Sequence, residues 1–208
     1  MKYNFSQYTT DLHRKISFDF LPGKRLLDVG CGTCVDSYFF KNIHNLDVYS
    51  TDVFKHKNVD TFGLKFKVGS IINLPYKSSC FDYVFVHDVL HHIDEKHQKY
   101  SMHVNALREL KRVVKNNGVI VIVEANRYNP LFYPHMVRLL KHNHFTQKYF
   151  KSLIKSVFEI ESVSFKYFEC HAYPKRLYKF FKVYELLMEK FVPERLLAYN
   201  CAIIQVKK

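Results

Sequence analysis

The stretch Leu26-Leu27-Asp28-Val29-Gly30-Cys31-Gly32-Thr33-Cys34 decides the fold. Its first four residues form a short, largely apolar run, which is typical of a buried strand in a parallel sheet. Gly30 and Gly32 follow at once, and a backbone without Cβ atoms allows a ligand to approach closely at the start of a helix. A nicotinamide dinucleotide site would place a third glycine three residues after Gly32, where this chain has Val35. The turn therefore predicts a cofactor site and disfavours a nicotinamide cofactor.

A carboxylate stands where such a site needs one. Asp52 closes the next apolar segment, 22 residues after Gly30. In doubly wound folds an acid at the end of the second strand accepts both ribose hydroxyls. The alternative is an ordinary strand-to-helix turn with Asp52 on the surface, but the combination of strand, glycines and acid favours a ribose-containing cofactor.

Apolar segments alternate with helical ones along the chain, which predicts a parallel sheet with helices on both faces. We expect the Asn116-Asn117-Gly118 stretch to end one helix, because Asn and Gly tolerate a left-handed cap. The last long helix has a probable break near Pro193. The predicted helices are residues 3–20, 35–42, 95–114, 145–156 and 174–197, and the predicted strands are 25–29, 47–51, 64–68, 81–86, 119–123, 158–167 and 198–206.

Further motifs follow the glycine turn in a fixed order. They are Gly69-Ser70 with Asn73-Leu74-Pro75-Tyr76, then Phe81-Asp82-Tyr83-Val84 with Leu90-His91-His92-Ile93, and finally the run from Leu107 to Lys115 leading to Gly118. Together they cover residues 22–126 and resemble the class I S-adenosylmethionine-dependent methyltransferases, in the type-11 branch.

The resemblance implies a Rossmann-like α/β fold, with a seven-stranded, mostly parallel sheet, helices on both faces and an antiparallel last strand. It implies a single domain over 1–208, with a cofactor-binding core at 22–126, an acceptor-site or lid region at 127–197 and the last strand at 198–206. The implied activity is methyl transfer from S-adenosyl-L-methionine to a small-molecule or lipid-like acceptor by in-line displacement.

Roles in the family carry over position by position. Cys34 and Ser70 depart from the family, which usually has Gly and Asp there; the small Cys34 side chain fits at the helix start if its backbone angles are ordinary. The implied cofactor-binding residues are Asp28 and Gly30 near the methionine end, Gly32 and Asp52 at the ribose, Val53, Ser70 and Ile71 around the adenine, His87 near the sulfonium, and Cys31 between the two glycines.

Polar residues that follow the fourth and fifth predicted strands are the catalytic candidates. His91 and His92 can act as a general base because imidazole titrates near neutral pH, and Glu124 matches an acid that accompanies such a His in similar small-molecule O-methyltransferases. The alternative makes one His a packing residue and the other a surface residue. Arg127 and Tyr128 enter the predicted acceptor pocket, where Arg127 can hold a phosphate or carboxylate or remain a solvated loop residue.

The charge of the chain does not identify the acceptor. The net charge is +13, and residues 125–208 hold 15 Lys and Arg against 6 Asp and Glu. This balance suits RNA or an anionic membrane surface, so an RNA-modifying (for example tRNA-modifying) methyltransferase is the alternative. The predicted helix at 174–197 interleaves aromatic and basic residues, and it can pack on the sheet, cover the acceptor pocket or lie on a membrane.

Composition also bears on the other classes of protein to which the chain could belong. No apolar run approaches the ~20 residues that span a bilayer, and no leader opens the chain, so we expect a cytoplasmic protein. The five cysteines are scattered, and no metal site is predicted from them. Cys31 and Cys34 also match a C-x-x-C redox pattern, which leaves Asp28 and Gly30 without a role. A non-catalytic scaffold with this fold is a further alternative, motivated by Cys34 and Ser70.

Overall fold

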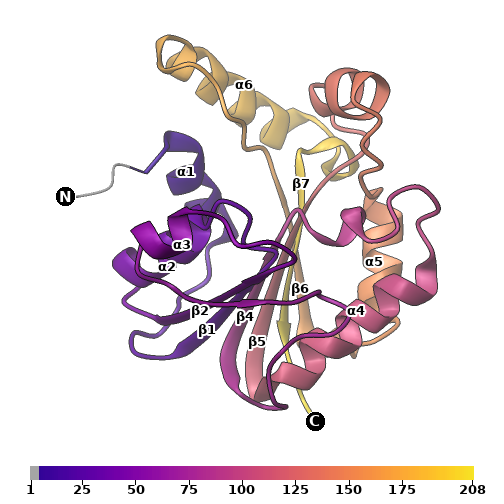
Figure 1. Cartoon of the computed structure of the whole chain (residues 1–208). Coiled ribbons are helices and arrows are strands. Elements are labelled where there is room, and N and C mark those ends of the chain that lie inside the picture. The colour runs from indigo at the N-terminus through magenta and orange to yellow at the C-terminus, as the bar shows by residue number, and fades with distance from the viewer. Residues whose placement is uncertain (1–4) are drawn as a thin grey trace.

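The computed structural model describes residues 5–208 and contains one seven-stranded sheet (Figure 1). The strand order is β3-β2-β1-β4-β5-β7-β6, and β7 runs antiparallel to both of its neighbours while the other pairings are parallel. The predicted Rossmann-like architecture is confirmed. The strands are β1 Arg25–Val29, β2 Asp47–Asp52, β3 Lys65–Val68, β4 Phe81–His87, β5 Val114–Ala125, β6 Val163–Phe168 and β7 Tyr199–Gln205.

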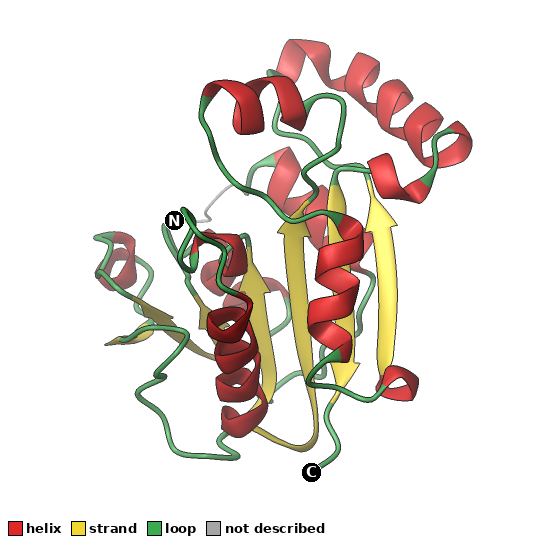
Figure 2. Cartoon of the chain, turned by 90° about the vertical axis from the view of Figure 1, so that its right-hand side faces the viewer, coloured by secondary structure: helices red, strands yellow, loops and turns green. Residues whose placement is uncertain are grey.

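Helices cover both faces of the sheet, and each face has its own core. On one face, α4 (Tyr100–Val113) and α5 (Gln147–Lys155) bury Leu107 and Leu153 against strand residues such as Val84 (Figure 2). On the other, α1 (Gln7–Ile16) and α2 (Val35–Ile43) bury Leu12 and Phe40 against Phe85. Adjacent residues of β4 therefore face opposite cores, which explains why the strand is apolar without a break from Tyr83 to Val86.

The junction between α4 and β5 differs from the prediction. The helix begins at Tyr100 instead of residue 95 and ends at Val113, and β5 starts at the next residue. Asn117 does take the left-handed conformation (φ 60°), but it does so inside the β5 segment, beside an irregularity in the pairing with β4. Asn116-Asn117-Gly118 therefore does not cap the helix. Gly118 is needed there because a Cβ would lie 2.8 Å from the carbonyl oxygen of Asp82.

Other boundaries are shorter than predicted. The N-terminal helix was expected over 3–20 and is α1, Gln7–Ile16; positions 3 and 4 of that range lie outside the described residues. The strand expected over 158–167 starts only at Val163, and the helix expected over 174–197 is α6, Tyr178–Phe191, which ends before Pro193. The sequence analysis missed the short helix α3 (Asn58–Thr61) and a π-helical turn at Tyr133–Leu139.

The carboxyl ends of the parallel strands meet at one edge of the sheet. Both α6 and the turn at Tyr133–Leu139 lie beyond this edge, at the top of Figures 1 and 2. Within residues 5–208, none of the helices is long and apolar enough to cross a bilayer.

Candidate active site

A cavity of about 570 Å³ opens at the carboxyl ends of β1, β2 and β4. This is the edge where open α/β sheets bind their ligands. Six of the predicted cofactor residues line it: Gly30, Gly32, Asp52, Val53, Ser70 and Ile71.

The two positions of the turn require glycine for different structural reasons. Both have positive φ, 70° at Gly30 and 48° at Gly32. A Cβ on Gly30 would lie 2.4 Å from Cγ2 of Val89, so this position is fixed by packing. A Cβ on Gly32 would meet no atom within 4 Å, and this position keeps the loop backbone open to the cavity.

Asp52 ties the second strand to the glycine turn. Its Oδ2 accepts a hydrogen bond from the backbone N–H of Gly32 at 2.8 Å, and its Oδ1 accepts one from Val53 at 2.7 Å. Each carboxylate oxygen can accept a further bond, so the side chain can still take a pair of hydroxyls. Next to it, the side chains of Val53, Phe54 and Ile72 form an exposed apolar rim, to which Val53 contributes a side chain that is 67% exposed.

The charge that lines the cavity is opposite to that of the protein. Asp52, Asp88 and Asp94 contribute carboxylates and His92 an imidazole, and none of the described lining residues is Lys or Arg. In a chain of net charge +13 this is a local reversal of sign. Such a lining attracts a cationic ligand and repels the phosphates of a dinucleotide.

The backbone at Cys34 does not have the ordinary angles under which a cysteine would fit there without strain. It precedes α2 in the left-handed conformation, with φ 62° and ψ 21°, and its side chain is fully buried. Its Sγ lies 3.4 Å from Sγ of Cys31, and both pack with Val59 and Phe62. The position where the family usually has Gly thus still takes a glycine-like conformation, with a Cβ added.

Three predicted cofactor residues lie behind the cavity wall. Asp28 is buried and accepts a hydrogen bond from Ser37, and burial raises the pKa of its carboxyl to about 7. Cys31 is nearly buried beside Cys34. His87 contacts Asp36 through Nδ1 at 2.8 Å and the Tyr8 hydroxyl through Nε2 at 3.2 Å. Burial opposes its charged form, but the Asp36 carboxylate prevails and raises the pKa of His87 to about 9.

The structure pairs the buried side chains of His91 and Glu124, whereas His92, whose ring centroid is 4.0 Å from that of His91, faces the cavity. His91 Nδ1 lies 2.7 Å from Glu124 Oε2, and Glu124 Oε1 accepts the backbone N–H groups of Val89 and Leu90 at 3.0 and 2.7 Å. Both side chains are fully buried, so the pair holds the turn after β4 in place. His92, the next residue, lines the cavity and is half exposed.

Arg127 and Tyr128 line a neighbouring hollow of about 270 Å³ instead of the cofactor cavity. The Arg127 guanidinium donates a hydrogen bond to the side-chain oxygen of Asn143. His144 lines the same hollow, and burial lowers its pKa to about 4, so it is neutral at neutral pH. These side chains face a space adjacent to the His92 side of the site.

Sequence analysis missed several polar residues around the cavity. Asp88 and Asp94 line it, and Glu95 and His142 contact each other and His92 nearby. The sequence could have indicated Asp88 as a site residue, because it directly follows the fourth strand. No sequence pattern could have indicated Glu95 and His142, since 46 residues separate them and only the folded chain brings them together.

Residues 27–122 match the protein family described as "Methyltransferase domain". The match covers 96 of the 208 residues and supports the predicted resemblance to the class I S-adenosylmethionine-dependent methyltransferases. The matched range runs from β1 to β5 and contains the glycine turn, Asp52 and the His91-His92 segment.

Curated relatives resemble this chain over about half of its length. It is 30% identical over 126 residues to an uncharacterised methyltransferase of Schizosaccharomyces pombe, covering 53% of this chain and 43% of that protein. It is 29% identical over 114 residues to a demethylmenaquinone methyltransferase of Staphylococcus saprophyticus, covering 50% of this chain and 46% of the other. The matched parts thus span less than half of these relatives.

Solved structures share the fold over nearly the whole chain. A Haloferax volcanii methyltransferase, solved in complex with a methyltransferase activator, superposes with a TM-score of 0.69 at 11% identity, over 97% of this chain and 90% of that one. Phosphoethanolamine N-methyltransferase 2 of Haemonchus contortus, in complex with S-adenosyl-L-methionine, superposes with a TM-score of 0.64 at 12% identity, over 96% and 52%. At these identities the likeness concerns the fold.

Proposed function

We propose that this protein transfers the methyl group of S-adenosyl-L-methionine to an acceptor at the carboxyl edge of its sheet. The match to the methyltransferase family supports this activity, and the acidic cavity is the observation that carries it. The cofactor bears a sulfonium, an ammonium and one carboxylate, so its net charge is positive, and it has no phosphate. This suits a cavity with three carboxylates and no lysine or arginine among its described lining residues.

The described residues fit the parts of this cofactor. The open backbone at Gly32 would admit the methionine–ribose portion, and the Asp52 carboxylate would accept the ribose hydroxyls. The exposed apolar rim at Val53 would pack on the adenine ring, next to Ser70 and Ile71. S-Adenosylmethionine supplies the electrophilic methyl carbon; the protein orients that carbon and the acceptor in line and excludes water between them.

We assign the acceptor side of the site to His92. It is the one of the three predicted catalytic residues that lines the cavity. His91 and Glu124 act on it as positioning residues, because their hydrogen bonds hold the turn that carries His92. During transfer the acceptor lone pair forms a bond to the methyl carbon while the carbon–sulfur bond breaks, and its electron pair neutralises the sulfonium.

Cofactor binding tests this proposal through Asp52. We expect S-adenosylhomocysteine to bind the wild-type chain, and Asp52→Asn to weaken binding at least about tenfold, since a hydrogen bond to a charged group contributes roughly 1.5–3 kcal/mol. Isothermal titration calorimetry measures the change. Asp60→Asn is the matched control, because Asp60 is exposed and pairs only with Lys55 among the described ion pairs. Absence of binding by the wild-type chain would refute the proposed activity.

We further propose that the acceptor is lipid-like and is taken from an anionic membrane surface. The support comes from α6, whose apolar stripe faces outward: Phe180, Val183, Leu187 and Phe191 are exposed at helical spacing, with Phe180 68% exposed. Exposed Lys and Arg residues flank the stripe, at 175, 176, 179 and 190. An apolar helix face with basic flanks is typical of membrane-surface binding. The demethylmenaquinone methyltransferase among the relatives points to the same class.

Vesicle sedimentation tests this acceptor class. We expect the wild-type chain to bind vesicles of phosphatidylcholine with phosphatidylserine, and Phe180→Asp with Leu187→Asp to reduce binding at least about tenfold while S-adenosylhomocysteine binding is unchanged. Ile160→Asp is the control, because Ile160 is equally apolar and exposed but precedes β6 at the opposite edge. If the chain instead does not bind vesicles but binds tRNA with a steep salt dependence, the proposed lipid-like acceptor is wrong and the acceptor is RNA.

A further inference from the structure

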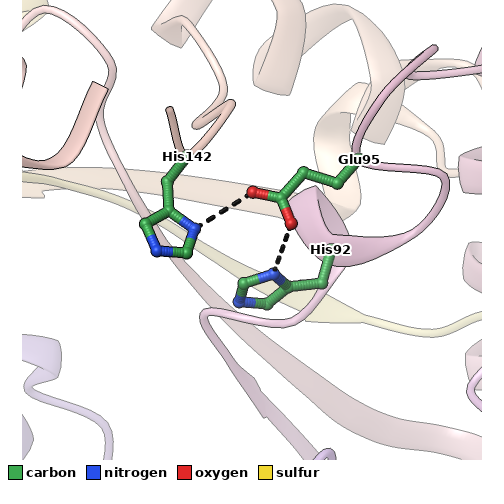
Figure 3. A group of neighbouring side chains, drawn as sticks. All are labelled: His92, Glu95 and His142. Carbon is green, nitrogen blue, oxygen red and sulfur yellow. Dashed lines mark hydrogen bonds and ion pairs between the residues drawn. The ribbon is translucent and has the colours of Figure 1, made fainter. Parts of the chain in front are cut away.

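Three side chains outside the described cofactor contacts meet at the acceptor side of the cavity. The carboxylate of Glu95 lies between two imidazoles: its Oε1 is 3.0 Å from His142 Nδ1 and its Oε2 is 3.3 Å from His92 Nδ1 (Figure 3). One atom from each of the three lies within 4.8 Å of the others. His92 also lines the cavity, so this cluster adjoins the space where the methyl group would be transferred.

Two distant segments form the cluster. His92 and Glu95 belong to the loop after β4, and His142 follows the turn at Tyr133–Leu139. Among the described residues Glu95 forms ion pairs only with the two histidines. Glu95 Oε1 also accepts the backbone N–H of Asn143 at 3.4 Å. Although the chain has 32 Lys and Arg, none of the described ones pairs with this carboxylate, so no permanent positive charge balances it.

The chemistry of the three donors suits a transition metal. Imidazole nitrogens and a carboxylate are ligands for Zn²⁺, Fe²⁺ and similar ions, whereas Mg²⁺ and Ca²⁺ prefer oxygen alone. The side chains are 50% (His92), 34% (Glu95) and 37% (His142) exposed, so an ion can enter and keep coordination positions open on the solvent side. Two histidines and one carboxylate with open positions resemble a catalytic more than a closed structural site.

A fourth imidazole is an independent observation at the same place. His144 is only 5% exposed, and neither of its ring nitrogens has a hydrogen-bond partner. Its ring centroid lies 6.1 Å from that of His142 and 4.4 Å from that of His91. A buried imidazole with two unsatisfied nitrogens is costly unless it has a further partner, and a ligand at this cluster would provide one.

A second group of ligand-type side chains is less suited to an ion. Asp88, His91 and Glu124 also lie within 4.8 Å of one another. The Glu124 carboxylate, however, already accepts two backbone N–H groups, and Asp88 accepts the N–H of Ala125 at 2.7 Å. A cation there would displace donors that hold the turn after β4.

We propose that His92, Glu95 and His142 bind a divalent transition-metal ion at the acceptor side of the cavity. Binding would replace the imidazole protons that now face Glu95 and would leave open positions for an oxygen of the acceptor. The metal site stands on its own residues, whereas its role in holding an acceptor oxygen rests on the proposed function.

Direct metal binding tests the inference. The chain, prepared without a histidine tag, is titrated with Zn²⁺ by calorimetry, and with Co²⁺, whose visible absorption reports coordination by nitrogen and oxygen ligands. We expect one ion per chain, and Glu95→Gln and His142→Ala should each weaken binding at least about tenfold, because each removes one of three ligands. His97→Ala is the matched control, since His97 forms the same kind of contact with Asp94, at 3.0 Å and three residues apart.

S-Adenosylhomocysteine binding, measured on the same samples, separates the two proposals. If the variants lose Zn²⁺ but keep the nucleoside, the metal site is supported and the variants are folded. If the wild-type chain binds the nucleoside but no stoichiometric metal, or if Glu95→Gln binds Zn²⁺ as tightly as wild type, the metal inference is wrong and the methyltransferase proposal stands. If metal binds but the nucleoside does not, the proposed function fails alone.

Discussion

Cys34 sits under backbone strain at the start of α2. A left-handed conformation costs an L-residue roughly 1–2 kcal/mol, a cost that glycine avoids. The fully buried side chain of Cys34 packs with Cys31, Val59 and Phe62, and this packing offsets part of that cost. Cys31, three residues earlier and also nearly buried, does not have positive φ.

This contrast predicts that glycine and alanine variants rank in opposite order of stability at the two cysteine positions. At position 34 we expect Cys34→Gly to be more stable than Cys34→Ala by about 1 kcal/mol, since only alanine retains the left-handed strain. At position 31 we expect the usual order, with Cys31→Ala more stable than Cys31→Gly by about 0.5–1 kcal/mol. Urea unfolding measures all four variants. The same ranking at both positions would show that the conformation at Cys34 is not strained.

At the scale of single residues, sequence reasoning found the cofactor side of the cavity better than its acceptor side. Gly30, Gly32 and Asp52 were predictable because short-range spacing fixes them relative to β1 and β2. Asp28 and His87 are close to the cavity in sequence, but the pleat turns their side chains into the interior. The roles of His91, His92 and Glu124 in catalysis remain predictions.

At the scale of elements, α6 is attached by its polar face. Lys182 contacts Asp11 of α1 at 2.7 Å and Glu185 at 2.6 Å, and both carboxylates are almost fully buried. Lys15 of α1 reaches Glu185 at 3.5 Å and also pairs with Glu189. Met188 is buried on this inner face too, but charges occupy much of it, and Phe180, Val183, Leu187 and Phe191 remain exposed. The amphipathic pattern indicated a helix here but not which face is buried.

Removal of the central cation should therefore release α6. In Lys182→Met, Asp11 and Glu185 lose their closest partner, and breaking a buried ion pair on one side costs about 3 kcal/mol. We expect faster amide hydrogen exchange across Tyr178–Phe191 and a lower free energy of unfolding in urea. Lys179→Met, at an exposed position of the same helix, controls for the loss of a charge. Unchanged exchange in Lys182→Met would mean that apolar contacts, and not this network, hold the helix.

At the scale of the whole molecule, the distribution of charge matters more than its sum. The net charge of +13 suggested an anionic partner, yet the charged side chains that line the cavity are acidic. Basic residues flank the apolar stripe of α6 at the same edge of the sheet. One protein can thus bind a cationic cofactor in its acidic cavity and an anionic membrane at the basic flanks of α6, because the cavity and these flanks are separated in space.

The order and type of the main elements, the glycine turn and the acid that faces it could all be inferred from the amino-acid sequence. These features depend on residues close together along the chain, where hydrophobic period and spacing act directly. Three other features became visible in the folded chain alone: the contact between Glu95 and His142, the outward direction of the apolar stripe of α6 and the left-handed backbone of Cys34. Each of these depends on packing between segments far apart in the chain, and local sequence patterns do not encode such contacts.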